Sequence, residues 1–534
     1  MRYRLHELSL PLDYQDQDII QMAARKLRVK INSLKDFAII RRSIDARRKL
    51  SFVFTVEFTM GKNTQFIKIP KLDVVIPGNK PTVLDGLNIK SAQRPVIIGA
   101  GPAGLMAGLV LAKNGLKPVL YERGADAVTR SDQVVDFWKN GKLNNESNAL
   151  YGEGGAGLFS DGKLTARSKD KPGIKYLFET LVQCGAPESI LIEAEPHLGS
   201  DIVKEIVPCL RKKIIEAGGE VFFNSKVEKI NIIDNKLCSI IVNGNEIKTD
   251  TCVIATGHSA RDVYQFLADA NVQLDQKAFA VGVRMELPQN IINETQWGKF
   301  AGHPRLGAAA FRLTRKESED ARSCYTFCMC PGGLTIACAS TAGQITTNGM
   351  SLSKRSLNFG NAAFLVPVRP EDYKSFETEF YPSLAGCHFQ ADIEKKAFEA
   401  GGGDYSIPVS SLPRFIDPVS NVLVSEKRSC LKVKEADFSK ILPGFVNETL
   451  VSAIPKMIKS FKGLSFDDVT LYAAETRSSS PVRIKRDEDR QSVNTQGLFP
   501  CGEGAGYAGG IVSSALDGIR VAESIIKKNL DSAR

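Results

Sequence analysis

The sequence predicts an α/β fold: a Rossmann-like dinucleotide-binding domain with a β-meander, an inserted α+β substrate or cap domain, and a small N-terminal α+β domain. Three observations favour this architecture. A G-x-G-x-x-G motif over Gly99–Gly104 stands between an apolar, β-branched run and a helical pattern. Short segments between residues 221 and 248, with Asn- and Gly-bearing turns, predict a meander that leads into the buried strand of TCVIATG. The block from residue 497 onwards is again typical of a strand, a Gly-rich turn and a helix.

Residues 1–88 are predicted to form the separate N-terminal unit. Arg2–Leu10 is strand-like, and residues 52–59 place phenylalanine and valine at every second position, the period of a β-strand. Between them, apolar residues recur at helical spacing, namely Ile19, Ile20, Ala23, Ala24 and Leu27. A linker that contains proline and glycine, residues 76–90, leads into the dinucleotide domain.

The N-terminal unit also carries most of the net charge. Between Arg25 and Lys49 there are ten lysines and arginines against two acids, so this segment supplies +8 of the chain's +10. Such a run is either a solvated basic face or a surface that docks an anionic partner, such as RNA, an acidic carrier or a second subunit.

The dinucleotide motif lies on its expected elements. Val96–Ile98 is predicted to be a buried parallel strand, residues 105–113 a helix, and Val119–Tyr121 a second strand that ends at Glu122. The first glycine allows a tight turn, the second lets backbone approach the pyrophosphate, and the third lets helix pack on strand. The N–H groups at the helix start favour phosphate, and Glu122 is placed to bind ribose hydroxyls.

The dinucleotide domain is expected to comprise residues 92–268 and 465–534. Residues 270–465 mix strands and helices, contain no second G-x-G-x-x-G after a strand, and are expected to form the inserted domain.

Composition favours a soluble cytoplasmic protein. Hydrophobic residues make up 43% and charged residues 24% of the chain, and the N-terminus shows no secretory segment. No membrane partner is expected, because the one long apolar stretch is explained by the dinucleotide loop. The eleven cysteines are scattered without a disulfide framework, which suits a reducing compartment.

Three blocks together resemble FAD flavoproteins of the glutathione reductase and fumarate reductase superclass. They are the N-terminal glycine motif with its acid, the A-T-G turn after the meander, and G-L-F-P-C-G-E before the last helix. A closer resemblance is to the bacterial family of uncharacterised FAD-dependent dehydrogenases. The segments that carry it are SIDARRK, YGEGGAGLFSDGKL, EPHLGSD, CMCPGG, ETRSSSPVRI and PCGEGAGYAGGI.

The resemblance implies that FAD is the cofactor and assigns residues to its parts. Pyrophosphate is assigned to Gly99, Gly101, Ala103 and Gly104, and the adenosine to Glu122, Arg123 and the backbone at Val227. Glu503 is expected at ribityl hydroxyls or phosphate, and the helix from Gly510 and Ile511 at the flavin pyrimidine edge. The remaining expected contacts are Gly155, Ser160, Gly162, Lys163, Thr256, Gly257 and Gly502.

Several cysteines are candidates for chemistry. In a regular strand Cys324, Cys328 and Cys330 would share one face, which would suit a metal site, a thiol beside the flavin, or a plain core strand. Cys501, next to the flavin turn, is interpreted as buried filler.

Histidines and arginines give further candidates. His197 and His258 are either structural or catalytic, and Arg284 or Arg477 could hold a substrate carboxylate or form an interdomain ion pair. The sequence assigns no catalytic acid or base.

The predicted function is that of an FAD-dependent oxidoreductase, a dehydrogenase acting on an unidentified small substrate, with NAD(P)H as a candidate transient reductant. One alternative is a flavoprotein that modifies tRNA or another RNA. A third interpretation is a non-catalytic module in which FAD is structural.

Overall fold

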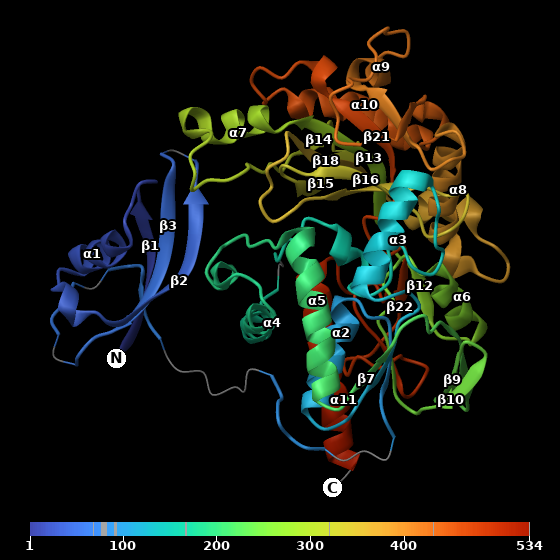
Figure 1. Cartoon of the computed structure of the whole chain (residues 1–534), viewed down its shortest axis with the longest axis horizontal. Helices are drawn as coiled ribbons and strands as arrows, with labels where there is room; N and C mark the ends of the chain where they lie inside the picture. Colours follow the sequence, from blue (N-terminus) through green and yellow to red (C-terminus); the bar gives the residue numbers. More distant parts are fainter. Residues whose placement is uncertain are drawn as a thin grey trace.

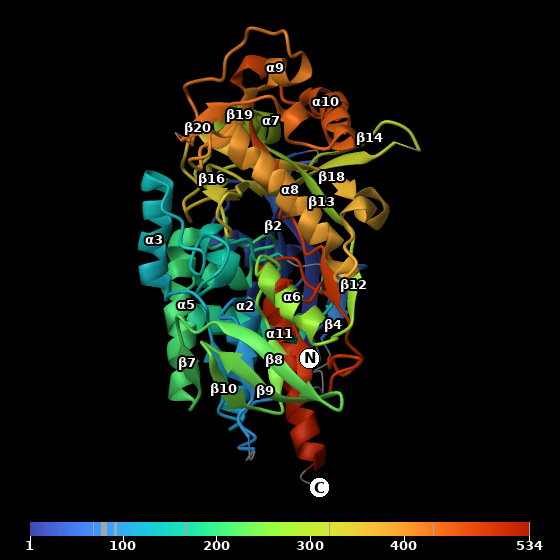
Figure 2. The same cartoon turned by 90° about the vertical axis from the view of Figure 1, so that its right-hand side faces the viewer.

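The computed structural model is built from three bodies (Figure 1). A small N-terminal unit lies beside a larger part, in which a parallel-sheet domain is capped by a second, larger sheet; Figure 2 shows the same two layers from the side. The structure describes residues 1–47, 49–62, 64–67, 69–75, 83–89, 93–165, 168–319, 321–430 and 432–532. Much of the predicted linker and Arg48 lie outside the described residues.

The N-terminal unit is an antiparallel sheet covered by one helix. Its strand order is β2-β3-β1-β4, and the alternating side chains of β3 put Phe54 and Phe58 in the core against Leu5 and Leu8. The elements are β1 (Arg2–Leu10), α1 (Asp16–Leu27), η1 (Ile31–Ser33), β2 (Lys35–Asp45), β3 (Ser51–Thr59) and β4 (Leu72–Val74).

The dinucleotide domain has a five-stranded parallel sheet of order β23-β11-β5-β6-β7. Its strands are β5 (Val96–Ile98), β6 (Val119–Tyr121), β7 (Glu220–Phe222), β11 (Cys252–Ile254) and β23 (Leu498–Pro500). Helix α2 (Pro102–Lys113) is apolar on all sides and is buried between this sheet, α5 and α11. The helices of this domain are α3 (Ala127–Asn140), η2 (Gly155–Phe159), α4 (Lys171–Gln183), η3 (Glu188–Leu191), α5 (Gly199–Glu216), α6 (Arg261–Asp269) and α11 (Ile511–Ser532).

The predicted meander forms a separate three-stranded sheet at one side of the parallel sheet. Its strands are β8 (Val227–Ile233), β9 (Lys236–Val242) and β10 (Asn245–Lys248), paired antiparallel in that order. Buried Ile230 and Ile240 pack this sheet onto α6.

The capping domain is a seven-stranded sheet of order β14-β15-β18-β13-β21-β19-β20. Its strands are β13 (Phe279–Pro288), β14 (Thr314–Lys316), β15 (Ser323–Cys330), β18 (Phe359–Val368), β19 (Ile407–Ser411), β20 (Val433–Glu435) and β21 (Thr470–Glu475). Because β21 is a central strand of this sheet, the capping domain extends beyond residue 465, the boundary that we predicted from the sequence. One face packs on helices through an apolar core that includes Val283, Phe364 and Leu450.

Smaller elements complete the capping domain and its junction. Two ribbons pair β12 (Leu274–Gln276) with β22 (Val482–Ile484) and β16 (Leu334–Cys338) with β17 (Thr346–Met350). The helices are α7 (Gln289–Trp297), η4 (Gly298–Phe300), η5 (Pro370–Phe376), η6 (Pro382–Leu384), α8 (Ala385–Ala400), α9 (Leu412–Ile416), η7 (Phe438–Lys440), α10 (Gly444–Ile458) and η8 (Phe466–Asp468).

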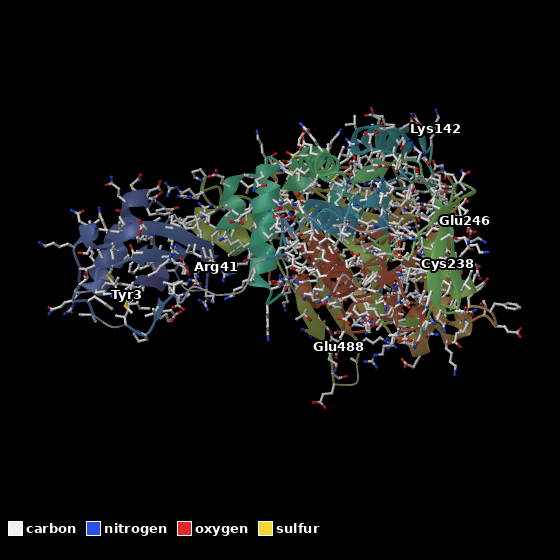
Figure 3. The ribbon with its side chains drawn as sticks, turned by 90° about the horizontal axis from the view of Figure 1, so that it is seen from below. Tyr3, Arg41, Lys142, Cys238, Glu246 and Glu488 are labelled. Carbon is white, nitrogen blue, oxygen red and sulfur yellow. The ribbon has the colours of Figure 1, made fainter. Side chains whose placement is uncertain are left out.

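The N-terminal unit is tied to both other bodies. The Arg42 backbone donates to Ile192 and accepts from Ala194, and its guanidinium pairs with Glu193 at 3.0 Å. Arg305 of the capping domain donates to the carbonyl of Tyr14 at 2.6 Å. Figure 3 shows this unit, with Tyr3 and Arg41, at one end of the molecule and Cys238 and Glu246 at the other. Among the described helices, none is both long and apolar enough to cross a membrane.

Candidate flavin site

Three loops meet at the carboxyl edge of the parallel sheet. Ile98, Ile254 and Pro500 end β5, β11 and β23 in matching register, so the loops that follow start side by side. β6 continues the sheet on one side of β5 and β11 on the other, which makes this edge the topological switch point where ligands bind in open α/β sheets.

The glycines of the first loop divide into two kinds. Gly99 has a φ of +104°, and a Cβ on Gly104 would lie 1.9 Å from the carbonyl oxygen of Gly99, so both are required by the fold itself. Gly101 differs, because its φ is −77° and a Cβ there would meet nothing closer than the Gly155 Cα at 3.8 Å. Neither backbone conformation nor internal packing requires a glycine at Gly101.

A ligand that approaches the backbone explains Gly101. It is the N-cap of α2, so the free N–H groups of the first helical turn lie directly beside it. Gly509, before α11, has the same character, with open space where a Cβ would be. These features fit the pyrophosphate and flavin of FAD, whose contacts with protein backbone need such exposed N–H groups.

Arg130 adds a positive charge to this cradle. It is fully buried in α3, donates to the carbonyls of Asn148, Glu153 and Gly155 at 2.7, 2.7 and 2.8 Å, and its Nη2 has no partner. Burial lowers the pKa of Arg130 to about 10, so it stays charged at neutral pH. Gly155 packs against Gly101, which places this guanidinium near the expected pyrophosphate. Sequence reasoning missed Arg130, because an arginine inside a helix carries no motif.

The charged residues expected near the adenosine are held in place by hydrogen bonds and ion pairs. The Glu122 carboxylate accepts from the Ala100 and Gly124 backbone N–H groups at 2.8 and 2.9 Å, which locks it at the end of β6. Arg123 does not point freely at a ligand, because it forms a bidentate pair with Asp262, both bonds 2.8 Å, and also donates to Glu146. Val227 is buried at the start of β8.

The two segments expected around the flavin lie side by side. A Cβ on Gly157 would be 3.1 Å from Ile511, and one on Gly502 would be 2.9 Å from Ala103, so both segments pack on the α2 start. Some groups in these segments are already engaged within the protein. The Ser160 hydroxyl is used within its own turn, donating to Gly157, and the Gly162 region packs against Gly199.

Lys163 links this segment to the capping sheet. Its ammonium donates to the backbone carbonyl of Met329 in β15 and lies 3.9 Å from Asp161. Asp161 is buried and pairs with Arg355 at 2.9 Å, which fixes the far end of the segment.

The A-T-G turn brings His258 to Glu503. Gly257 packs against Gly504, and His258 Nε2 lies 3.9 Å from Glu503 Oε1, while its Nδ1 is buried without a partner. Burial raises the pKa of Glu503 to about 7, whereas burial and then the charges of Arg477 and Arg261 lower the pKa of His258 to about 3. At neutral pH the histidine is therefore neutral, and the carboxyl group is close to half protonated.

The arginines expected to clamp a carboxylate are already paired inside the protein. Arg284 is fully buried and forms a bidentate pair with Glu475 at 2.6 and 3.0 Å, supported by Asn361 at 2.9 Å. Arg477 forms a similar pair with Glu394, both bonds 2.9 Å. Both arginines thus form buried ion pairs within the capping domain, Arg284 between β13 and β21 and Arg477 between the loop after β21 and α8.

The three cysteines of β15 do not share a face. β15 advances from Phe327 to Cys330 while its partner β18 advances only from Ala363 to Asn361, which is a β-bulge. Before the bulge Cys324 lies on the core face, and after it Cys330 lies on the opposite face with Arg284 and Asn361. The expectation of one shared face was wrong, because one extra residue inverts the alternation.

The other candidates are placed as follows. His197 hydrogen-bonds the Ser353 carbonyl at 3.0 Å behind Lys163, and Cys501 is fully buried, which raises the pKa of its thiol. Within the part of the chain that the structure describes, no group of three or more His, Cys, Asp or Glu side chains is arranged to hold a metal ion.

Comparison with known families supports the cofactor. Residues 94–136 match an FAD binding domain, residues 278–478 match the C-terminal domain-like region of FAD-dependent proteins, and residues 2–59 match a domain of unknown function. FAD is therefore the cofactor of this flavoprotein.

Solved structures that are similar to the chain are distant. The flavin-dependent brominase Bmp2 is 12% identical over 82% of this chain and 79% of its own, with a TM-score of 0.36. Glycerol-3-phosphate dehydrogenase from Bacillus halodurans, complexed with FAD, is 12% identical over 84% and 66%, with a TM-score of 0.34. The halogenase PltM in complex with FAD is 12% identical over 83% and 70%, with a TM-score of 0.38.

A relative from Clostridium beijerinckii is much closer. This uncharacterised protein is 43% identical over 543 aligned positions that cover 99% of both chains. The chain therefore belongs to a family of uncharacterised FAD-dependent proteins.

Proposed function

We propose that the protein is an FAD-dependent oxidoreductase that acts on a small substrate between the flavin segments and the capping sheet. The observation that carries this proposal is the polar face of that sheet. Its buried Arg284, Glu475, Asn361 and Cys330 lie on the face opposite the apolar core, where Asn348 of β17 accepts from Arg284 and Thr347 of β17 donates to Glu475. A site between this sheet and the flavin segments is supported by Lys163 of the 151–164 segment, whose ammonium donates to the Met329 carbonyl of β15.

FAD supplies two-electron chemistry when bound, and the chain supplies position and field. Gly510, with a φ of +139°, ends the loop so that α11 begins at Ile511, and the Gly509 N–H is held by Ser513 at 3.1 Å. The first turn of α11 offers unpaired N–H groups, which stabilise negative charge beside them.

Glu503 is the group best suited to hold a proton. Its pKa of about 7 lets it exchange a proton near neutral pH, and the neutral His258 beside it excludes a competing positive charge. We propose that this carboxyl group binds or relays a proton at the cofactor.

The test begins with purified holoprotein. We expect a yellow protein that releases FAD, not FMN, on denaturation, and whose flavin absorbance is lost anaerobically with at least one donor class among NADH, NADPH, small alcohols, 2-hydroxy acids and dithiols. Glu503→Gln should keep FAD and shift the pH profile of that reduction. Flavin that no donor in this panel reduces would overturn the redox proposal in favour of structural FAD.

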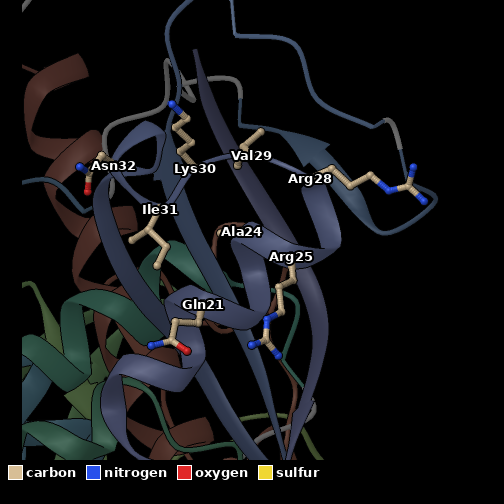
Figure 4. Close-up of a pocket in the computed structure, with 8 residues that line it drawn as sticks. All are labelled: Gln21, Ala24, Arg25, Arg28, Val29, Lys30, Ile31 and Asn32. Atoms are coloured by element: carbon tan, nitrogen blue, oxygen red, sulfur yellow. The ribbon is translucent and has the colours of Figure 1, made fainter.

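A second candidate function concerns the N-terminal unit, and a hollow in its surface favours it. Arg25, Arg28 and Lys30 line a cavity of about 510 Å³ beside α1, with no acid among the lining residues (Figure 4). Two arginines in the 41–48 part of the basic run are engaged elsewhere, because Arg42 pairs with Glu193 and Arg47 with Asp45 at 2.7 Å. We propose this hollow, rather than the 41–48 segment, as the site for an anionic partner such as RNA.

Binding of labelled single-stranded RNA at several salt concentrations tests the second candidate. For a single strand the logarithm of affinity should fall with the logarithm of salt by about 0.7 per phosphate contact. The double variant Arg25→Ser/Arg28→Ser should flatten that slope, whereas Arg47→Ser should not, because Arg47 is already paired with Asp45 two residues before it in the chain. Equal slopes for wild type and the double variant would refute the proposal.

A reducing cytoplasm is the compartment that we propose. All eleven cysteines are free thiols in the structure.

A further inference from the structure

Two thiols on the polar sheet face, Cys328 and Cys330, form a contact pair. Cys330 is fully buried, its Sγ donates to the Cys328 carbonyl oxygen at 3.4 Å, and only Met329 separates the two cysteines in the chain. The end of β15 that carries them contacts the dinucleotide domain, because the Lys163 ammonium donates to the Met329 carbonyl.

The backbone at this pair is unusual. Cys328 has a φ of +43°, in the left-handed region that few residues other than glycine adopt. The β-bulge between Phe327 and Cys330 accounts for it and turns both cysteines out of the core. Bulges and strained residues concentrate beside functional sites, so this distortion is a second sign of a role for the pair.

Cations surround the pair. The Lys163 ammonium donates to the Met329 carbonyl, between the two cysteines, and Arg284 donates to the Cys328 carbonyl at 3.3 Å. The hydrogen bond from Cys330, then the charges of Arg284 and Lys163, lower the pKa of the Cys328 thiol to about 6 against the effect of burial. The pKa of Cys330 is raised, because it donates to Cys328 and is buried. At neutral pH the pair is a thiolate beside a thiol.

The pair faces the segments assigned to the flavin. Lys163 belongs to the 151–164 segment, and Glu503, in the loop after β23, is close enough to Cys328 for the two negative charges to raise the pKa of Glu503. The end of β15 that carries Cys328 therefore faces the segments assigned to the flavin.

A second thiol pair in the same chain provides a contrast. Cys184, after α4, is hydrogen-bonded to Cys209 of α5, but both pack in the apolar core of the dinucleotide domain. Burial raises the pKa of the Cys184 thiol to about 12, so this thiol stays protonated at neutral pH. Cys328 differs from Cys184 because it accepts a hydrogen bond from Cys330 and lies near the charges of Arg284 and Lys163, all of which lower the pKa of its thiol.

We propose that Cys328 and Cys330 are a dithiol–disulfide couple that exchanges two electrons with the bound flavin, an inference that rests on the redox function proposed above. In the oxidising direction an S–S bond forms between the Cys328 thiolate and Cys330, and the S–H bond of Cys330 breaks. The two electrons and that proton pass to oxidised flavin, which becomes the singly protonated, reduced anion. The reverse step restores thiolate and thiol and reoxidises the flavin.

The experiment uses air-oxidised holoprotein. One half is alkylated, digested with trypsin and weighed by mass spectrometry, where both cysteines fall in the peptide from Ser323 to Lys354. The other half is titrated anaerobically with dithionite while flavin absorbance is followed. We expect a disulfide between Cys328 and Cys330, and an electron uptake per FAD about twice that of Cys328→Ser and of Cys330→Ser. Cys184→Ser is the matched control and should keep the wild-type uptake.

Two results would overturn the inference. One is alkylation of Cys328 and Cys330 as free thiols in air-oxidised wild type, a measurement that needs no variant to fold. The other is equal electron uptake by wild type and Cys328→Ser at equal FAD content. Either result with a flavin that a donor still reduces leaves the proposed oxidoreductase function intact. Flavin that no donor reduces refutes that function instead.

Discussion

The glycine cradle at the parallel sheet and the polar face of the capping sheet form one site by opposite means. The cradle is made of backbone groups, namely Gly101 and the N–H groups at the starts of α2 and α11. It needs few side chains to bind the cofactor. The polar face is made of side chains from separate strands, with Arg284 on β13, Asn361 on β18 and Glu475 on β21. A site built from one turn leaves a readable motif, whereas one built across a sheet leaves scattered residues.

The difference also concerns what each region can tolerate. A cradle that is open toward a ligand can be filled without unfolding the protein, so damage there appears as lost cofactor. A buried ion pair that joins strands supports the fold, so damage there appears as lost stability. The following predictions test that separation.

The largest effect is expected from Gly101→Val. The side chain would occupy the space that the pyrophosphate needs, while no protein atom closer than 3.8 Å opposes its Cβ. We expect FAD content to fall about tenfold or more, equivalent to at least about 1.4 kcal/mol of binding free energy, with unchanged far-UV circular dichroism. Gly444→Val, at the open start of α10, is the control and should keep its FAD. Full FAD content in Gly101→Val would show that the cradle is misplaced.

Breaking the buried pair should cost about 3–5 kcal/mol of unfolding free energy. Glu475→Leu leaves the Arg284 guanidinium, which is fully buried, without its carboxylate. Chemical denaturation measures the loss. The double variant Arg284→Met/Glu475→Leu should recover much of it, because no uncompensated charge remains. If the double variant loses the sum of both single losses, the two side chains do not act as a pair.

Glu503 should make the free energy of unfolding fall as the pH rises toward 7. Its pKa is about 7 in the folded chain and about 4.5 in the unfolded chain, so between these values the folded state holds a proton that the unfolded state has released. Stability therefore falls as the pH rises from about 4.5 to 7, by about 3–4 kcal/mol at most. In FAD-free protein the gap between wild type and Glu503→Gln should change across this window. The exposed control Glu488→Gln should run parallel to wild type.

The smallest effect is expected at the edge of the N-terminal unit. Arg42 and Glu193 are partly exposed, so Glu193→Gln should cost no more than about 1 kcal/mol, and less at high salt. Thermal unfolding at two salt concentrations measures this. A loss as large as that of Glu475→Leu would remove the contrast between exposed and buried pairs.

The elements and motifs that depend on neighbouring residues could be predicted from the sequence. Strand Val96–Ile98, the glycine turn, α2 and the acid that ends β6 follow one another within about 25 residues, so their spacing carries their geometry. The meander and the alternation of β3 are local in the same sense, because a period of two depends only on neighbours.

Tertiary structure decided what depends on contacts between distant segments. The β-bulge that moves Cys330 to the face opposite Cys324 arises from pairing with β18, and nothing in the letters CMC marks it. Arg130 gains its role only because Gly155 and Gly101 are brought together, and Arg284 and Arg477 turned inward because Glu475 and Glu394 lie opposite them. These features depend on the distances between segments that are far apart in the sequence, and the sequence does not give those distances.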